Sequence, residues 1–220
     1  MPRRVIPFLP DQYYHFYNRG NNRQPVFFER ENYLFFLRRF KRFVIGYVDV
    51  IAYCLMPTHY HILVRVKQAL RQISEGQISE VWQTSEISTP RQEASKQISL
   101  AMQKFGISYT KAINKRFGRV GALFQGQFQG KPVQSYNHLL NLCVYIHANP
   151  VKDGLVSLPE NWEYSNYLEW MDLRAGTLVN REFIAQNFGT PEEYKVKVND
   201  YIKTRYLSDE FQTYIQEVER

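Results

Sequence analysis

Two stretches rich in β-branched and aromatic residues, separated by only three residues, limit most strongly how this chain can fold. They span residues 47–55 and 59–67, and Met56, Pro57 and Thr58 lie between them. Proline has no amide hydrogen to donate to a sheet, so Pro57 marks a turn between two strands. The pattern therefore predicts a hairpin-like pair of strands.

Further elements are predicted on both sides of this pair. Alternating residues favour strands, and apolar residues at i, i+3, i+4 and i+7 favour helices. One helix is expected to end at Asn149, because the residue before a proline disfavours the helical conformation. The patterns predict strands at 13–17 and 121–133, and helices at 29–44, 96–117 and 135–149. The order β-α-β-β-α-β-α predicts an α+β protein with a ferredoxin-like (split β-α-β) antiparallel sheet.

Two segments differ from the rest in composition. Residues 67–95 are rich in Ser, Gln and Glu with scattered apolar residues, which is typical of a mobile insertion. Residues 171–220 are predicted to be helical and separate. We therefore predict a main domain at 1–170, which contains the insertion, and a C-terminal helical extension at 171–220.

Composition indicates the cellular compartment in which the protein is expected. No apolar run approaches the ~18 residues that a membrane span requires, and the N-terminal apolar stretch is too short for a signal peptide. The two cysteines, Cys54 and Cys143, lie in apolar segments without CxxC spacing. Such cysteines are typical of reduced thiols, so we expect a cytoplasmic protein that does not enter a membrane.

The net charge of +7 is unevenly distributed. Residues 1–170 hold 21 Lys and Arg against 12 Asp and Glu, and no acidic residue lies between Glu93 and Asp153. Carboxylates would cancel the field that a polyanion feels, so this segment favours phosphate binding. A solvated basic surface without a ligand is the alternative. The predicted nucleic-acid contacts are Lys104, Lys111, Lys115, Arg116 and Arg119, together with Arg19 and Arg23 in the loop after the first strand.

His59 and His61 are the first candidates for chemistry. Residues i and i+2 of a strand face the same side, so the two imidazoles lie side by side with their Cα atoms ~7 Å apart. Such a pair can bind one divalent cation, although a stable site needs a third ligand from elsewhere. Two ordinary histidines, one buried and one exposed, are the alternative.

Tyr145 is the second candidate. At 100° per residue it lies away from the apolar stripe around Leu140, on a polar face shared with Asn149 one turn later. The usual alternative is a packed tyrosine, and Asn149 has its own alternative as a helix cap before Pro150. His147 lies on the apolar side and is predicted to be a packed or hydrogen-bonded core histidine.

The segments AYCLMPTHYHILV, RFGRVGALFQGQF and YIHANPVKDGLV follow one another as in the single-tyrosine HUH transposases. The chain resembles the REP-associated tyrosine transposase branch of that family, and YHFYNRGNNRQPVFF is similar to the family's opening strand and loop. The resemblance spans about residues 13–167. It implies a ferredoxin-like fold, a Mg²⁺ or Mn²⁺ ion, and single-stranded hairpin DNA (a REP-like palindrome) as substrate.

On this resemblance His59 and His61 would be the metal-binding pair, Asn149 the third metal ligand and Tyr145 the nucleophile. Tyr60 departs in part from the bulky apolar residue that is usual between the histidines. The implied enzyme is a metal-dependent single-strand DNA endonuclease and strand-transferase, a transposase that forms a 5′-phosphotyrosine. A monomer is implied as well, with a dimer as the alternative.

Other functions remain open from the sequence. A domesticated relative would bind hairpin DNA or RNA without cutting it. A rolling-circle initiator or relaxase would be a different HUH enzyme, and a hydrolase using water would not need Tyr145. Because residues 171–220 are net acidic, we expect them to regulate or occlude the site.

Overall fold

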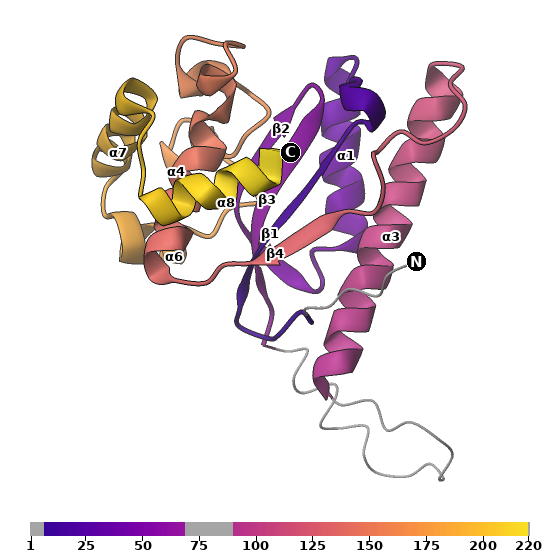
Figure 1. The fold of residues 1–220 in the computed structure, drawn as a ribbon, viewed down its shortest axis with the longest axis horizontal. Coiled ribbons are helices and arrows are strands. Elements are labelled where there is room, and N and C mark those ends of the chain that lie inside the picture. Colours follow the sequence, from indigo (N-terminus) through magenta and orange to yellow (C-terminus); the bar gives the residue numbers. More distant parts are fainter. Residues whose placement is uncertain (1–6, 69–89, 220) are drawn as a thin grey trace. The chain divides into compact units, whose positions relative to one another are not determined.

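The computed structural model describes residues 7–68 and 90–219. In chain order, the strands of the sheet and the helices between and directly after them are β1 (Tyr13–Arg19), α1 (Arg30–Phe43), β2 (Val48–Met56), β3 (His59–Val66), α3 (Pro90–Arg116), β4 (Gln129–Pro132) and α4 (Tyr136–Lys152) (Figure 1). They are joined or followed by two 3₁₀ turns, η1 (Asn21–Arg23) and η2 (Pro159–Asn161), and by α5 (Tyr167–Trp170), α6 (Arg181–Phe188), α7 (Pro191–Thr204) and α8 (Asp209–Glu219).

The four strands form one sheet in the order β2-β3-β1-β4. β1 and β4 pair antiparallel, with Tyr14 opposite Pro132 and Tyr17 opposite Gln129. A helix lies between β1 and β2 in the sequence, and another between β3 and β4. This order of elements and strands is that of the ferredoxin-like fold, so the predicted α+β class is confirmed.

The predicted pair of strands is confirmed as β2 and β3, which are joined by Pro57 and Thr58. The carbonyl of Pro57 accepts hydrogen bonds from the backbone amides of Val26 at 2.8 Å and Phe27 at 3.2 Å. The turn is therefore tied to the loop that leads into α1.

The described residues form two compact units, and both β2 and β3 contribute to each of them. The first unit takes its described residues from 1–49, 57–59 and 64–132. Its helices α1 and α3 pack through aromatic rings, such as Phe36 against Phe105 with centroids 4.8 Å apart. The hydroxyl of Tyr109 on α3 also donates to the carbonyl of Val26 at 2.7 Å.

The second unit takes its described residues from 50–56, 60–63 and 133–220. Its central helix α4 begins at the N-cap Ser135, whose side chain accepts a hydrogen bond from the amide of His138. Every residue from Leu142 to Pro150 is buried. Buried positions on consecutive residues cover all sides of a helix, so α4 is enclosed and has no solvent face over this stretch.

Two predicted boundaries are wrong. α4 continues through Pro150 to Lys152, because a proline disfavours the helical conformation of the preceding residue without forbidding it. The predicted strand at 121–133 is shortened to β4. The φ angles of 83° at Gly121 and 143° at Gly126 interrupt regular pairing, and a bridge between Gly20 and Phe124 remains.

The predicted insertion at 67–95 lies largely outside the described residues, but α3 begins at Pro90 and therefore within it. The domain boundary near residue 170 stays a prediction. In the structure α6, α7 and α8 belong to the same compact unit as α4. Over the described part of the chain, no helix is long and apolar enough to cross a bilayer.

Candidate active site around Tyr145

The side chain of Tyr145 is fully buried at the centre of the second unit. Its ring meets the His61 ring of β3 edge-on, with centroids 5.6 Å apart and an interplanar angle of 77°. Phe211 of α8 lies on it with a centroid separation of 6.0 Å. The phenol hydroxyl donates to the Glu219 carboxylate at 2.6 Å. The face of α4 that carries Tyr145 is thus covered by α8, where the helical periodicity had indicated a polar face.

Lys152 completes this group of side chains. Its ammonium group donates to Oε1 of Glu219, the same oxygen that accepts from Tyr145. The ammonium nitrogen also lies 5.2 Å from the centroid of the Tyr145 ring and 3.4 Å from Oδ1 of Asp153. One carboxylate oxygen is therefore shared by a phenol and an ammonium group.

These surroundings hold Tyr145 in its neutral form. Burial is the main cause that raises its pKa well above the usual value, and the charge and hydrogen bond of Glu219 add to it. The side chain of Asn149 acts in the opposite direction and lowers the pKa. Ionisation of Tyr145 is therefore disfavoured while Glu219 occupies this position.

Asn149 lies one turn after Tyr145 and is fully buried. Among the described residues, neither polar atom of its amide has a hydrogen-bond partner of ordinary geometry. A buried polar group without a partner costs about 1–3 kcal/mol, so this amide is suited to bind something further. Its oxygen is of a type that Mg²⁺ and Mn²⁺ accept.

The predicted metal ligands are distributed between the two units. His61 is buried and belongs to the second unit with Tyr145 and Asn149. His59 is half-buried, belongs to the first unit, and has its Nδ1 3.0 Å from Oγ1 of Thr58. Within the described residues no three His, Cys, Asp or Glu side chains gather as a metal site. An imidazole nitrogen, as in His61, and an amide oxygen, as in Asn149, are donor types that a divalent ion accepts.

The predicted nucleic-acid contacts lie in the first unit. Lys104, Lys111 and Lys115 are exposed on α3, and the spacing of seven and eleven residues puts the last two within about 20° of Lys104 around the helix. Lys111 and Lys115 lie on opposite sides of Lys104 and so about 40° from each other, and the three still form one narrow line of positive charge. Arg19 is half-buried at the end of β1, and Arg23 is exposed in η1.

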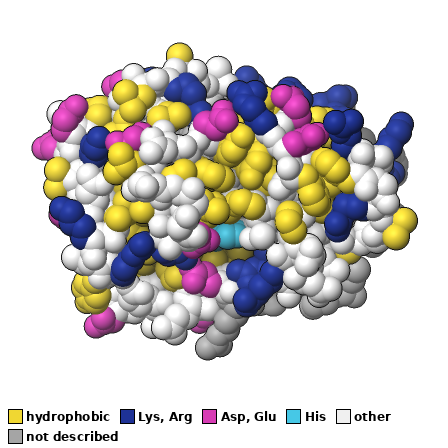
Figure 2. Space-filling model, turned by 90° about the horizontal axis from the view of Figure 1, so that it is seen from above, with side chains coloured by type: hydrophobic (Ala, Val, Ile, Leu, Met, Phe, Trp, Pro, Cys, Tyr) yellow, Lys and Arg dark blue, Asp and Glu magenta, His cyan; other side chains and the backbone are white. Residues whose placement is uncertain are grey.

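Charge in three dimensions is less uniform than in the sequence. Nε of Arg116 pairs with Oε1 of Glu29 at 3.3 Å, so a carboxylate from a distant segment reaches the acid-free stretch. The guanidinium group of Arg119 lies 5.5 Å from the centroid of the Phe28 ring. On the face drawn in Figure 2, basic and acidic side chains are interspersed.

His147 is a hydrogen-bonded core histidine, as its position on the apolar side of the helix predicted. Its Nδ1 lies 2.7 Å from the hydroxyl of Tyr194, and its Nε2 lies 2.9 Å from Oδ1 of Asn166. Because the amide oxygen can only accept, Nε2 carries the proton and Nδ1 accepts from Tyr194. Burial lowers the pKa of His147 to about 4, so the ring is neutral near pH 7.

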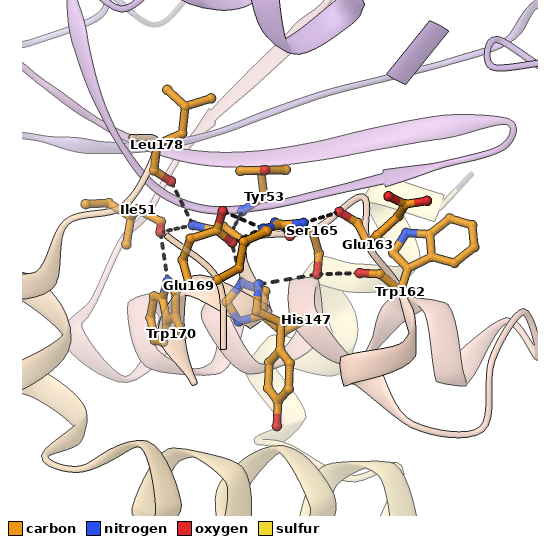
Figure 3. Close-up of polar contacts among 12 residues, drawn as sticks. Ile51, Tyr53, His147, Trp162, Glu163, Ser165, Glu169, Trp170 and Leu178 are labelled. Atoms are coloured by element: carbon orange, nitrogen blue, oxygen red, sulfur yellow. Dashed lines mark hydrogen bonds and ion pairs between the residues drawn. The ribbon is translucent and has the colours of Figure 1, made fainter. Parts of the chain in front are cut away.

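Asn166 extends this network to β2. Its Oδ1 also accepts from the backbone amide of Tyr53 at 2.6 Å, and its Nδ2 donates to the carbonyl of Ile51 at 2.9 Å. The indole of Trp170 donates to the same carbonyl of Ile51 at 3.2 Å (Figure 3). These bonds fix α4 relative to the second-unit part of β2, and so fix the position of Tyr145.

Sequence reasoning missed two residues of this site. Lys152 follows Tyr145 by seven residues, which is two helical turns, but it lies beyond Asn149, where the helix was predicted to end. Glu219 is 74 residues from Tyr145, and no local pattern indicates that they meet.

The fold and site together define an α+β protein with a buried tyrosine packed against a histidine strand. No model of a known protein family matches the chain, and no curated protein matches it. Among solved structures, it is similar to a REP-associated tyrosine transposase bound to a REP hairpin, with 16% identity and a TM-score of 0.49, over 82% of this chain and 94% of that chain.

A second solved structure is a bacterial tRNA(His) guanylyltransferase-like protein in complex with ATP. The similarity has 9% identity and a TM-score of 0.39, and covers 72% of this chain and 69% of that chain. At these TM-scores neither similarity bears on the chemistry at Tyr145.

Proposed function

We propose that the chain is a metal-dependent single-stranded DNA nuclease and strand-transferase with Tyr145 as its covalent nucleophile. The observation that carries this proposal is the edge-on contact of the Tyr145 and His61 rings, with the unpartnered amide of Asn149 one turn away. The motifs that contain these residues also resemble those of the single-tyrosine HUH transposases, in the same order.

In the proposed reaction the oxygen of Tyr145 attacks phosphorus, and the bond from phosphorus to the 3′-oxygen breaks. The phenol loses its proton to water and the leaving 3′-oxygen gains one, so the products are a 5′-phosphotyrosine and a 3′-hydroxyl. His59, His61 and Asn149 would hold Mg²⁺ or Mn²⁺, which would supply polarisation of the scissile phosphate. A second 3′-hydroxyl can reverse the step and join new strands, because the phosphoester bond is conserved.

The remaining residues would bind the DNA. The line of Lys104, Lys111 and Lys115 on α3 suits contacts with successive phosphates, which position a strand without reading its sequence. Hairpin DNA is the proposed substrate on the resemblance of the motifs. Since His61 and Tyr145 meet within one chain, a monomer is sufficient for that contact.

The decisive experiment uses a pool of hairpins with varied flanks, labelled separately at each end, in Mn²⁺. We expect Tyr145→Phe to abolish the covalent adduct and to retain hairpin binding, because only the hydroxyl is lost. Tyr136→Phe is a matched control, since Tyr136 is on the same helix but exposed. An adduct that survives in Tyr145→Phe, or that carries the upstream label, would contradict the proposal.

Metal dependence has its own test. We expect His61→Ala to reduce adduct formation at least 100-fold, EDTA to do the same to the unaltered protein, and Asn149→Ala to have a smaller effect because water can replace one amide ligand. Titration with Mn²⁺ and Mg²⁺ measures the dependence. Unchanged cleavage in EDTA would remove the metal from the mechanism.

A second candidate function is binding of hairpin DNA or RNA without cleavage. The burial of Tyr145 and its hydrogen bond to Glu219 favour this candidate, because the hydroxyl is engaged. Retention of hairpins by the protein without any adduct, in either metal, would select it.

A further inference from the structure

The oxygen Oε1 of Glu219 is held in a way that suits an oxygen of a phosphate group. It accepts hydrogen bonds from the phenol of Tyr145 and from the ammonium group of Lys152. A non-bridging phosphoryl oxygen is likewise an anionic acceptor, and a lysine ammonium is a frequent phosphate ligand. The carboxylate thus occupies a position whose donors match those that a phosphodiester needs.

The donors come from one face of α4. Tyr145, Asn149 and Lys152 follow one another at i, i+4 and i+7, so their side chains project to the same side of the helix. The Asn149 amide is fully buried, and among the described residues neither its nitrogen nor its oxygen has a hydrogen-bond partner of ordinary geometry, which is an independent sign of a ligand at this place. Its nitrogen can donate to an anion, and its oxygen could bind a cation.

The acidic groups near Lys152 do not prevent this role. Glu219 pairs with it most closely, and Oδ1 of Asp153 lies 3.4 Å from Nζ. The Glu219 side chain is 41% exposed and lies in the last turn of α8, so solvent screens its ion pair with Lys152. Phe211, Ile215 and Val218 anchor α8 separately, so the carboxylate can rotate away while the helix stays in place.

We propose that Lys152 binds the scissile phosphodiester in the position that the Glu219 carboxylate occupies in this structure. This inference rests on the proposed function. In the reaction described above, the bond from Tyr145 to phosphorus forms as the bond to the 3′-oxygen breaks, and charge concentrates on the non-bridging oxygens. The ammonium group of Lys152 stabilises that charge and is a catalytic residue that touches the substrate.

A binding experiment tests the subsite without any cleavage. Dimethyl phosphate is titrated into the full chain in EDTA and followed by ³¹P line broadening. Glu219→Gln should bind it at least fivefold more tightly than the unaltered protein, and addition of Lys152→Met should abolish the gain. Lys152→Arg should keep the gain in affinity. Lys203 is an exposed lysine of α7, so Lys203→Met is the matched control. Equal binding with and without Lys152→Met would overturn the proposal.

A kinetic experiment tests the role in catalysis. In the Glu219→Gln background, Lys152→Met should slow single-turnover adduct formation at least tenfold on a hairpin with a normal phosphate. On a hairpin with a neutral methylphosphonate at the scissile position, the same substitution should have almost no effect, because the charge that Lys152 contacts is gone. An equal loss on both substrates would overturn the proposal.

The outcomes separate this inference from the proposed function. If the Lys152→Met variant forms the adduct at Tyr145 at the full rate, the proposed nuclease function stands and Lys152 has no role in it. Absence of an adduct in every variant removes the nuclease, while the dimethyl phosphate titration still decides whether the subsite exists. If Glu219→Gln itself slows adduct formation tenfold, Glu219 acts as a base for Tyr145 and the proposal is wrong.

Discussion

Two neighbouring side chains of α4 are held in their neutral forms, and the consequence differs between them. Tyr145 and His147 are both fully buried, and burial favours the neutral form of each. For Tyr145 this opposes the proposed chemistry until Glu219 moves, because Glu219 raises the pKa further. For His147 the neutral form stabilises the fold, because only the neutral ring can accept a hydrogen bond from Tyr194 while it donates one to Asn166.

His147 should make stability depend on pH. Its pKa of about 4 lies below the usual value of 6.5, so its contribution is fully present above pH 6.5 and is lost as the pH falls toward 4. The shift corresponds to about 3 kcal/mol of unfolding free energy. Urea unfolding at pH 7 and pH 4.5 measures it, with His147→Gln as the comparison. An equal loss in His147→Gln would assign the effect to other groups.

At the scale of elements, the sequence was informative where the signal is local. Pro57 and the β-branched and aromatic residues on both sides of it predicted β2 and β3, because a turn and its strands lie within twenty residues. The environment of α4 was not predictable in the same way. Helical periodicity assumes that one side of a helix is buried, whereas α4 is enclosed by residues from α7 and α8 that lie far away in the sequence.

α8 is expected to restrain the site. Removal of residues 205–220 takes away Phe211 and Glu219, so Tyr145 becomes accessible and adduct formation should rise several-fold. The melting temperature should fall, because buried apolar surface of α8 is lost. A deletion of the whole segment 171–220 would also remove Tyr194 and its bond to His147, so it would not be informative. Slower adduct formation in a truncated chain that remains folded would show that α8 assists the reaction.

For the molecule as a whole, the positive charge of the first 170 residues was evident from the sequence, but its partners in space were not. Glu29 reaches Arg116 from a distant segment and neutralises part of the acid-free stretch. Lys104, Lys111 and Lys115 remain exposed along α3, so they are the strongest candidates for long-range attraction of DNA.

Affinity for hairpin DNA should fall steeply with salt. Each contact of a lysine with a phosphate contributes about −0.7 to the slope of log K against log salt on single strands, so substitution of the three α3 lysines by Met should reduce the slope by about 2. Lys195, Lys197 and Lys203 of α7, replaced together, form the control and should leave it unchanged. Fluorescence anisotropy at about 50 to 300 mM NaCl measures the affinity for hairpin DNA and its dependence on salt. A reversed order of the two triple variants would place the DNA surface on the second unit.

The network around Asn166 also covers one edge of the sheet. β2 is an edge strand of the sheet, and an uncovered edge can recruit strands of other molecules. Here Tyr53 pairs with the side chain of Asn166, and the amide of Leu55 donates to the carbonyl of Tyr164 at 2.9 Å. At the opposite edge β4 is only four residues long and ends in Pro132. Both edges are thus poor templates for β-aggregation, so the bond that helps to fix the tyrosine helix also protects β2 against pairing with a foreign strand.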